Sequence, residues 1–308
     1  MPANFPEVWR ARVETNLRAT DEAPWLAGVE ELDTEVIEMG SGTVGETNVI
    51  HLPVSEFEPT VLINNTAYPL ALQAYTDTEV VISLDKYQTL PTTLSDDQII
   101  GAAYNRIDNA TRSHSQAILK SKYAKAIHAM APASNTANTP VVLTTGAVEG
   151  GAATGRKIFT YKDLVALKKK FDDLQVPMIG RRIVLSTDHW NDLLLDRERF
   201  GDNFSNYRTG AAAPMVAGFE IYQYVANPYF TGTAKKAWGA APVAGDYQAS
   251  VAFYVPNIAM KTGMTKQYFA ESAKDPENQT NKLNYRHYFI AVPKRAKYIG
   301  AIASGEQA

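Results

Sequence analysis

The stretch SDDQIIGAAYNRIDNATRSHSQAILKSKYAKAIHAMA, residues 95–131, dominates the chain because it predicts one long helix. It contains no proline and a single glycine, Gly101, and Pro132 follows directly, where a helix cannot continue. Ser95 followed by Gln98 is typical of a capping box that begins a helix. At 1.5 Å per residue the helix would be about 55 Å long, which exceeds the diameter of an ordinary compact domain.

Apolar residues recur within this stretch at intervals of mostly three, four or seven, which places them on one face of the helix. This face consists of Ile100, Ala103, Ile107, Ala110, Ala117, Ala124, Ile127 and Ala131. Because most of these side chains are small, we expect a neighbouring element to pack closely against them. The stretch is either an ordinary core helix, kinked at Gly101 or around residues 111–116, or a helix with an architectural role.

The composition is that of a globular protein without a dominant charge. The chain has 308 residues, of which 45% are hydrophobic and 20% charged, and its net charge is -3. The absence of a basic stripe argues against a dedicated nucleic-acid interface, although it leaves weak, non-specific contact open. The sequence contains no cysteine, which excludes disulfides and thiolate zinc sites. It shows neither a signal peptide nor an apolar run of membrane-spanning length, so we expect a soluble, intracellular protein.

Residues 1–47 do not have the pattern of a domain. A short helix is predicted near residues 6–18, and an acidic stretch broken by Pro24 and several glycines follows it. Such a segment is either a frayed terminus or an arm that becomes ordered on a partner. Trp9 and Trp25 favour the partner, because exposed tryptophans are costly.

Residues 48–90 contain three short runs typical of strands, NVIHLPV, TVLIN and TEVVISLDKY. In the third run Val80, Ile82 and Leu84 alternate with the residues between them. Prolines near these runs indicate edge strands or strand ends. The block has too few apolar residues for a core of its own, which predicts a long hairpin that projects from the body.

The remaining sequence predicts a linker, an α/β region and a final hairpin. Residues 131–155 are rich in Ala, Thr, Gly and Asn, with one strand near 141–144. In residues 156–260, Thr160 with Asp163 begins a helix, residues 182–186 form a buried strand, and Ser186 or Thr187 caps a second helix. Further strands are predicted near 219–222 and 251–254. Residues 261–308 then predict two β arms around the polar tip KDPENQTN.

A search for chemistry yields no catalytic, cofactor-binding or metal-binding residues. The segment GGAATGRK, residues 150–157, has phosphate-loop glycine spacing, but Arg156 stands where that motif requires lysine. No two histidines have the spacing of three or four that a helical metal site needs. Asp188 and His189 follow a strand, where a catalytic role is conceivable, but the first turn of a helix explains the pair better. The lysines at 168–170 are expected to lie on a solvated face.

The segment VPMIGRRIVLSTDHWNDLLLDRERF is followed by a loop and by AGFEIYQY. Chiefly through these segments, the chain resembles the major capsid proteins of tailed bacteriophages, which have the Hong Kong 97-type coat fold. The segment FPEVWRARVETNL is similar to the opening arm of that family, and QYFAESAKDPENQTNKLNYRHYFIAVPKRAKYIGAI is similar to its closing hairpin. The similar segments extend over most of the chain and follow one another in the same order as in the family.

The resemblance implies an α+β protein with the Hong Kong 97-type capsid fold. Its parts would be an N-terminal arm, an extended β-hairpin loop, a peripheral domain with a long spine helix at 95–131, an α/β axial domain, and a return hairpin that completes the peripheral domain. In order along the chain, these parts would span residues 1–47, 48–92, 93–139, 140–260 and 261–308.

A capsid role implies contacts between copies of the chain. Arms and loops without a core bury their apolar residues only on assembly. The contact candidates are Trp9, Trp25, Val61, Ile63, Tyr68, Val80, Ile82 and Lys86. Lys86 is the only lysine of the extended-loop block, where some relatives form a cross-link to an asparagine, but no asparagine partner is indicated here.

The resemblance also implies partners and a location. The partners would be further copies in pentamers and hexamers, a separate scaffolding protein, portal and decoration proteins, and packaged DNA in non-specific contact. No membrane partner is expected. The protein would reside in the virion capsid after assembly in the host bacterial cytoplasm. Two alternatives remain, an encapsulin-like compartment with the same fold and an α/β enzyme domain at residues 156–260.

Overall fold

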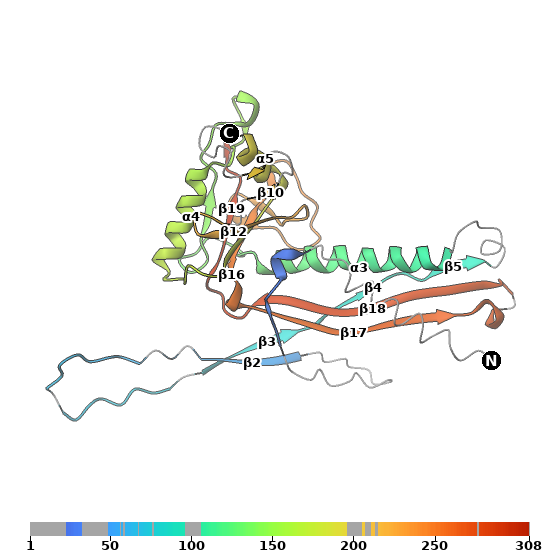
Figure 1. The fold of residues 1–308 in the computed structure, drawn as a ribbon, viewed down its shortest axis with the longest axis horizontal. Coiled ribbons are helices and arrows are strands. Elements are labelled where there is room, and N and C mark those ends of the chain that lie inside the picture. The colour runs from blue at the N-terminus through green and yellow to red at the C-terminus, as the bar shows by residue number, and fades with distance from the viewer. Residues whose placement is uncertain are drawn as a thin grey trace.

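Two larger β-sheets and one long helix build most of the molecule, and a hairpin extends away from them (Figure 1). The structure is a computed structural model. It describes residues 23–32, 49–95 except 56, 58, 67 and 76, then 106–195, 205–206, 211–212, and 215–307 except 276.

The first sheet is five-stranded and centres on a long antiparallel hairpin. Its two strands are β17 (Ile258–Ala270) and β18 (Thr280–Pro293), joined through the short helix η4 (Ser272–Lys274). Three short strands extend the sheet: β1 (Glu30–Glu31) beside β17, and β4 (Asp85–Gln88) and β5 (Thr92–Ser95) beside β18. These are the two arms and the polar tip predicted near the end of the chain.

The helix α3 (Arg106–Met130) lies along this hairpin as one element of 25 residues, about 37 Å long (Figure 1). It runs without a break through residues 111–116. Its buried residues recur at helical spacing and include polar ones: Thr111, Ser115, Ile118, Leu119, Lys122, Ala126, Ile127 and Met130. The predicted face was therefore partly wrong, since Ala117 is exposed. Ser95 lies in β5 rather than in a helix cap, and Gly101 lies outside the described residues.

The second sheet has six strands and a mixed topology in the order β11-β12-β8-β16-β19-β6. Its strands are β6 (Val141–Leu143), β8 (Arg181–Leu185), β11 (Met215–Val216), β12 (Phe219–Gln223), β16 (Ser250–Tyr254) and β19 (Ile299–Ala303). The strand β19 corrects the predicted return hairpin, because residues 299–303 leave the first sheet and lie between β16 and β6.

Two helices pack on the six-stranded sheet as the sequence predicted. The helix α4 (Tyr161–Asp173) begins with the capping box of Thr160 and Asp163 and buries Leu164, Leu167 and Phe171. The helix α5 (Thr187–Leu195) buries Trp190 and Leu193 in the same apolar cluster. Short elements fill the periphery: η2 (Glu149–Gly151), β7 (Gly155–Arg156), β9 (Ser205–Asn206), β10 (Ala211–Ala212), β13 (Tyr229–Thr231), β14 (Ala234–Lys235), β15 (Asp246–Gln248), η3 (Val255–Asn257) and β20 (Glu306–Gln307).

Residues 23–32, which we call the strap, cross the junction between the two sheets. The strap contains η1 (Pro24–Leu26) and ends in β1, which pairs in parallel with β17. Trp25 is fully buried in a cluster that joins the strap to the C-terminal half of α3 and to strands of both sheets. This corrects the interpretation of Trp25 as an exposed contact residue: its apolar surface is already covered within the chain.

The hairpin of β2 (Val49–Ser55) and β3 (Asp77–Ser83) projects from the body, with a long loop at its end (Figure 1). Its base is anchored, because Ile50 and Ile82 pack with Leu32, Leu84 and Ala259. The loop is shorter than predicted, since β4 and β5 return to the five-stranded sheet. The run TVLIN, residues 60–64, forms no strand.

Candidate assembly surfaces

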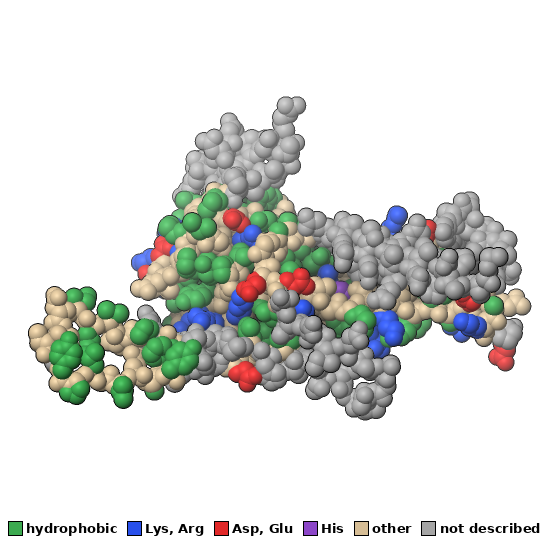
Figure 2. All heavy atoms as spheres, turned by 60° about the horizontal axis from the view of Figure 1, so that its bottom comes forward, with side chains coloured by type: hydrophobic (Ala, Val, Ile, Leu, Met, Phe, Trp, Pro, Cys, Tyr) green, Lys and Arg blue, Asp and Glu red, His purple; other side chains and the backbone are tan. Residues whose placement is uncertain are grey.

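The loop between β2 and β3 exposes large apolar side chains that its own chain does not cover. Val61 is 79% exposed, Ile63 84% and Tyr68 77%. Leu62, Leu70, Leu72 and Tyr75 are exposed as well. Hydrophobic side chains cover much of this projecting loop in Figure 2. Because an apolar patch of this kind on a soluble surface marks a site of contact, the loop is the main candidate for binding another protein surface.

The two limbs of the loop are held together by local contacts. The backbone N–H of Thr60 donates to Oε1 of Gln73 over 3.0 Å, and the rings of Phe57 and Tyr75 lie 5.1 Å apart. These contacts keep the limbs side by side, which presents the exposed residues as one ribbon.

The structure separates the predicted contact residues into three groups. Val61, Ile63, Tyr68 and Lys86 are exposed, as a contact role requires. Val80 is half-buried, and Ile82 is only 4% exposed in the anchor of the hairpin, so the prediction for Ile82 was wrong for the same reason as for Trp25. In both cases a segment that lacks a local core packs on a distant part of its own chain. Trp9 lies outside the described residues.

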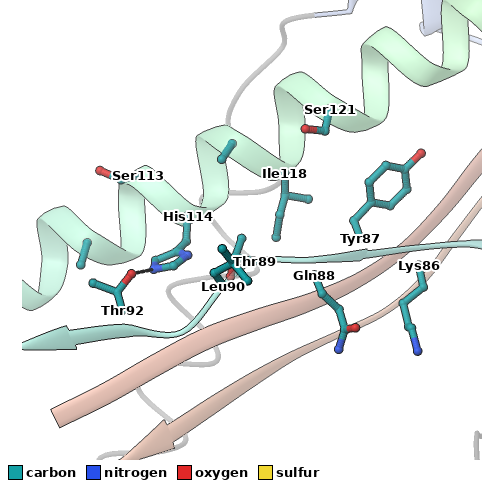
Figure 3. A pocket seen from close by; sticks show the side chains of 12 residues that line it. Lys86, Tyr87, Gln88, Thr89, Leu90, Thr92, Ser113, His114, Ile118 and Ser121 are labelled. Atoms are coloured by element: carbon teal, nitrogen blue, oxygen red, sulfur yellow. Dashed lines mark hydrogen bonds between the residues drawn. The ribbon is translucent and has the colours of Figure 1, made fainter. Parts of the chain in front are cut away.

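A groove of about 770 Å³ lies between α3 and the segment that connects β4 to β5 (Figure 3). Small residues of α3 form one wall, namely Ala110, Ser113, Ala117 and Ser121. Tyr87 points toward the helix, whereas Lys86 and Gln88 point to the other side of the strand (Figure 3). Leu90 is 86% exposed at the edge. The groove is open and lined with apolar and hydroxyl groups, which suits apolar side chains better than a charged ligand.

Two titratable groups of the groove are kept uncharged at neutral pH. The ring of His114 shares a hydrogen bond of 2.9 Å with Oγ1 of Thr92, and burial lowers its pKa. Burial, with a smaller contribution from the charge of Asp85, raises the pKa of the Tyr87 phenol. Both side chains therefore contribute neutral, largely apolar walls.

The junction beneath the strap is held by directed contacts from both sheets. Nη1 of Arg182 in β8 donates to the carbonyl oxygens of Trp25 (3.0 Å) and Ala27 (2.5 Å). On the other side, Nζ of Lys261 in β17 donates to the carbonyl of Leu32 over 2.6 Å, and Lys294 pairs with Glu30. The strap thus bonds to both sheets at once.

Two groups of polar residues in the six-stranded region are buried and hydrogen-bonded within the chain. Arg156 forms a bidentate pair with Asp192 (2.7 and 2.9 Å), and both side chains are buried. His189 is fully buried, with Ser250 Oγ 2.7 Å from Nδ1 and Ser304 Oγ 3.0 Å from Nε2. Burial and, to a lesser degree, the charge of Arg156 lower the pKa of His189 to about 3. Asp188 is exposed in the first turn of α5, as the helix interpretation predicted.

Within the described residues, no cluster of three or more His, Asp or Glu side chains could hold a metal. No helix in the described part of the chain is long and apolar enough to cross a membrane.

Comparison with known proteins identifies the family. A family model described as phage capsid protein matches residues 77–304, which is most of the chain. The chain belongs to the phage capsid protein family. It is therefore a structural capsid protein that self-assembles into a shell and resides in the virion. No curated protein matches the sequence at a significant level.

Solved structures show that this capsid protein has the Hong Kong 97-type fold. The capsid of the cyanophage P-SCSP1u aligns with a TM-score of 0.61 over 90% of this chain and 86% of that chain, at 14% identity. A Mycobacterium phage Che8 chain aligns with a TM-score of 0.56 over 82% and 84%, at 15% identity. A virus-like particle from Pyrococcus furiosus aligns with a TM-score of 0.56 over 97% and 100%, at 7% identity. The fold predicted from the resemblance is confirmed.

Three features were missed by reasoning from the sequence alone. Arg156 was considered only as a departure from the phosphate-loop motif, because its partner Asp192 lies 36 residues away. The strap was interpreted as an unanchored arm, since the residues that hold it come from distant strands. Lys122 was not recognised as buried, although it lies four residues after Ile118 and four before Ala126, and this spacing could have revealed it.

Proposed function

We propose that this capsid protein builds a closed icosahedral shell of pentamers and hexamers around the double-stranded DNA of a tailed phage. The observation that carries the proposal is the loop between β2 and β3, whose apolar side chains are exposed on a projecting ribbon. In a monomer this surface would face water, whereas in a shell a neighbouring copy covers it.

The groove beside α3 supplies a matching surface on the neighbour. It has an apolar floor and small side chains on the helix, and Ala117 and Leu90 are exposed at its edges. We infer that apolar residues of the loop from one copy lie in this groove of the next. The contact is repeated head to tail, and such a contact closes into rings when the rotation between copies permits it.

The division into an N-terminal arm, an extended loop, a peripheral domain and an axial domain forms part of this proposal. In this division the five-stranded sheet with α3 is the peripheral domain. The six-stranded sheet is the axial domain, near the centre of each ring of subunits. A separate scaffolding protein, portal and decoration proteins, assembly in the bacterial cytoplasm, weak contact with DNA and the absence of catalysis complete the proposal. They follow from the family role rather than from a particular contact.

A loop variant tests the assembly role. We expect Val61→Ser, Leu62→Ser and Ile63→Ser together to abolish shells in negative-stain electron microscopy, because the apolar contact is lost. The free energy of unfolding should change by less than about 0.5 kcal/mol per site, since all three side chains are exposed.

Val225→Ser is the matched control, because Val225 is 72% exposed but lies outside the loop. It should leave shells intact. Normal shells from the triple variant would remove the loop from the interface, and loss of cooperative unfolding would show that the loop belongs to the core. Particles that contain a protein cargo instead of DNA would contradict the proposed content of the shell.

A further inference from the structure

Two basic side chains, Lys122 of α3 and His287 of β18, are buried together between the long helix and the hairpin. Lys122 is 5% exposed and His287 is 1% exposed. Both lie against Phe289: Nζ of Lys122 is 4.8 Å from the centre of its ring, and the imidazole stacks on it at 6.4 Å. Basic groups are rarely buried without a carboxylate, so the arrangement calls for an explanation.

Lys122 has aromatic neighbours in place of an acidic one. Its Nζ lies 4.9 Å from the ring of Tyr123 as well as over Phe289, and among the described residues it forms no ion pair. Burial lowers the pKa of Lys122 to about 8. At neutral pH the ammonium group is thus still charged, and the rings stabilise it only in part.

His287 is uncharged in this environment. Its Nδ1 shares a hydrogen bond of 2.9 Å with Oγ1 of Thr265 in β17, whereas its buried Nε2 has no partner among the described residues. Burial, followed by the positive charge of Lys122, lowers the pKa of His287 to about 3. A proton on this ring would leave an N–H group without an acceptor beside an existing positive charge.

The other groups that face this pair cannot neutralise a second charge. On β4, Tyr87 stands opposite His287 and is itself kept neutral. Asp85 of the same strand carries a carboxylate, but its Oδ1 already accepts from Lys125 over 2.6 Å. Gln267 of β17 is a neutral amide, so it carries no negative charge that could balance a proton on His287.

We propose that the contact between α3 and β18 is a proton-sensitive joint, in which protonation of His287 beside Lys122 releases the helix from the hairpin. In the closed contact the ring must stay neutral, because it is dry, lacks an acceptor on Nε2 and adjoins an ammonium group. When the contact opens, water reaches both groups and the ring can take up a proton. Acid therefore favours the open contact. This inference does not depend on the proposed shell geometry.

The direction and size of the pH effect on the opening of α3 follow from the linkage between proton binding and conformation. A histidine whose pKa is lower in the closed state stabilises that state fully above its ordinary pKa of about 6.5, and this stabilisation is lost as the pH falls toward 3. Between these values each decrease of one pH unit raises the equilibrium constant for opening about tenfold. From pH 7.5 to 4.5 the opening of α3 should increase about 100-fold.

Hydrogen exchange on the full-length protein tests the joint. We expect the amides of α3 that face β18 to lose about 100-fold in protection between pH 7.5 and 4.5, after correction for the intrinsic exchange rate. His287→Gln keeps a polar side chain but cannot titrate, so the pH dependence of its α3 protection should be much smaller than in the wild type. The remaining dependence comes from His114 of α3, which packs on Tyr285 of β18 and whose pKa is also lowered by burial. Should His287→Gln fail to fold, Lys122→Met provides the second variant. It removes the neighbouring charge, and α3 should then open less in acid than in the wild type.

His189→Gln is the matched control. His189 is also buried with a pKa of about 3, but it lies in the six-stranded region away from α3. This variant should keep the wild-type pH dependence of α3. The proposal is overturned if wild-type α3 protection does not change with pH, or if His287→Gln and Lys122→Met both retain the full acid-induced opening.

Discussion

Trp25→Ala measures how firmly the strap belongs to the folded body. The indole is fully buried and contacts Tyr224 and Phe253 edge-on, at 5.6 and 6.5 Å between ring centres. Replacing a buried Phe or Trp by Ala costs about 3–5 kcal/mol. Nε1 of Trp25 is buried without a hydrogen-bond partner among the described residues, which costs free energy. Part of the packing energy of the indole offsets this cost, so the substitution removes a favourable and an unfavourable contribution together. We therefore expect a loss near the lower limit, about 3 kcal/mol.

The assay is urea unfolding of the unassembled protein, followed by near-ultraviolet circular dichroism. Trp238→Ala serves as the control, since Trp238 is 49% exposed and contacts only the edge of His128 among the described rings. It should cost less than about 1 kcal/mol. If Trp25→Ala left the unfolding midpoint unchanged and yet prevented shell formation, Trp25 would contact a neighbouring copy, and its assignment to the internal core would be wrong.

Two further substitutions test the buried ion pair and the long helix. Asp192→Asn should destabilise the protein by about 3 kcal/mol, because it removes the buried carboxylate opposite Arg156 and leaves only the exposed Glu149 to balance that charge. Glu149→Gln removes an exposed partner of the same arginine and should cost under about 1 kcal/mol, so equal losses would contradict this account. Ala117→Pro should cost about 3 kcal/mol or more through the backbone of α3 alone, since Ala117 is exposed. A thermal unfolding midpoint equal to that of Ala117→Ser would refute a continuous helix.

Local signals predicted the elements well. The capping box at Thr160 and the periodic residues after it predicted α4 because both lie within a few turns of chain. Local sequence likewise predicted β8 from the apolar run at residues 182–186. It also predicted the start of β18, because a polar tip precedes that strand. The fold class itself came from the resemblance of these segments, in this order, to the capsid family.

Contacts between distant segments could not be predicted in this way. The sequence around Ile82 shows a strand, but only the structure shows that its apolar side lies against Leu32 and Ala259. Of the assembly surface, the loop residues Val61 and Ile63 were predicted as contact candidates because their block has too few apolar residues for its own core, and both are exposed in the structure. The groove was not predicted, since its two walls come from separate parts of the chain.

The strap has a consequence for the order in which the protein folds. Its hydrogen bonds join residues 157 positions apart at Arg182, 229 at Lys261 and 264 at Lys294. Closing loops of this length costs entropy that is recovered only after both partner surfaces exist. We therefore expect the strap to dock late, after the strands that hold it have formed. A slow phase in tryptophan fluorescence would report this step, because Trp25 becomes buried when the strap docks.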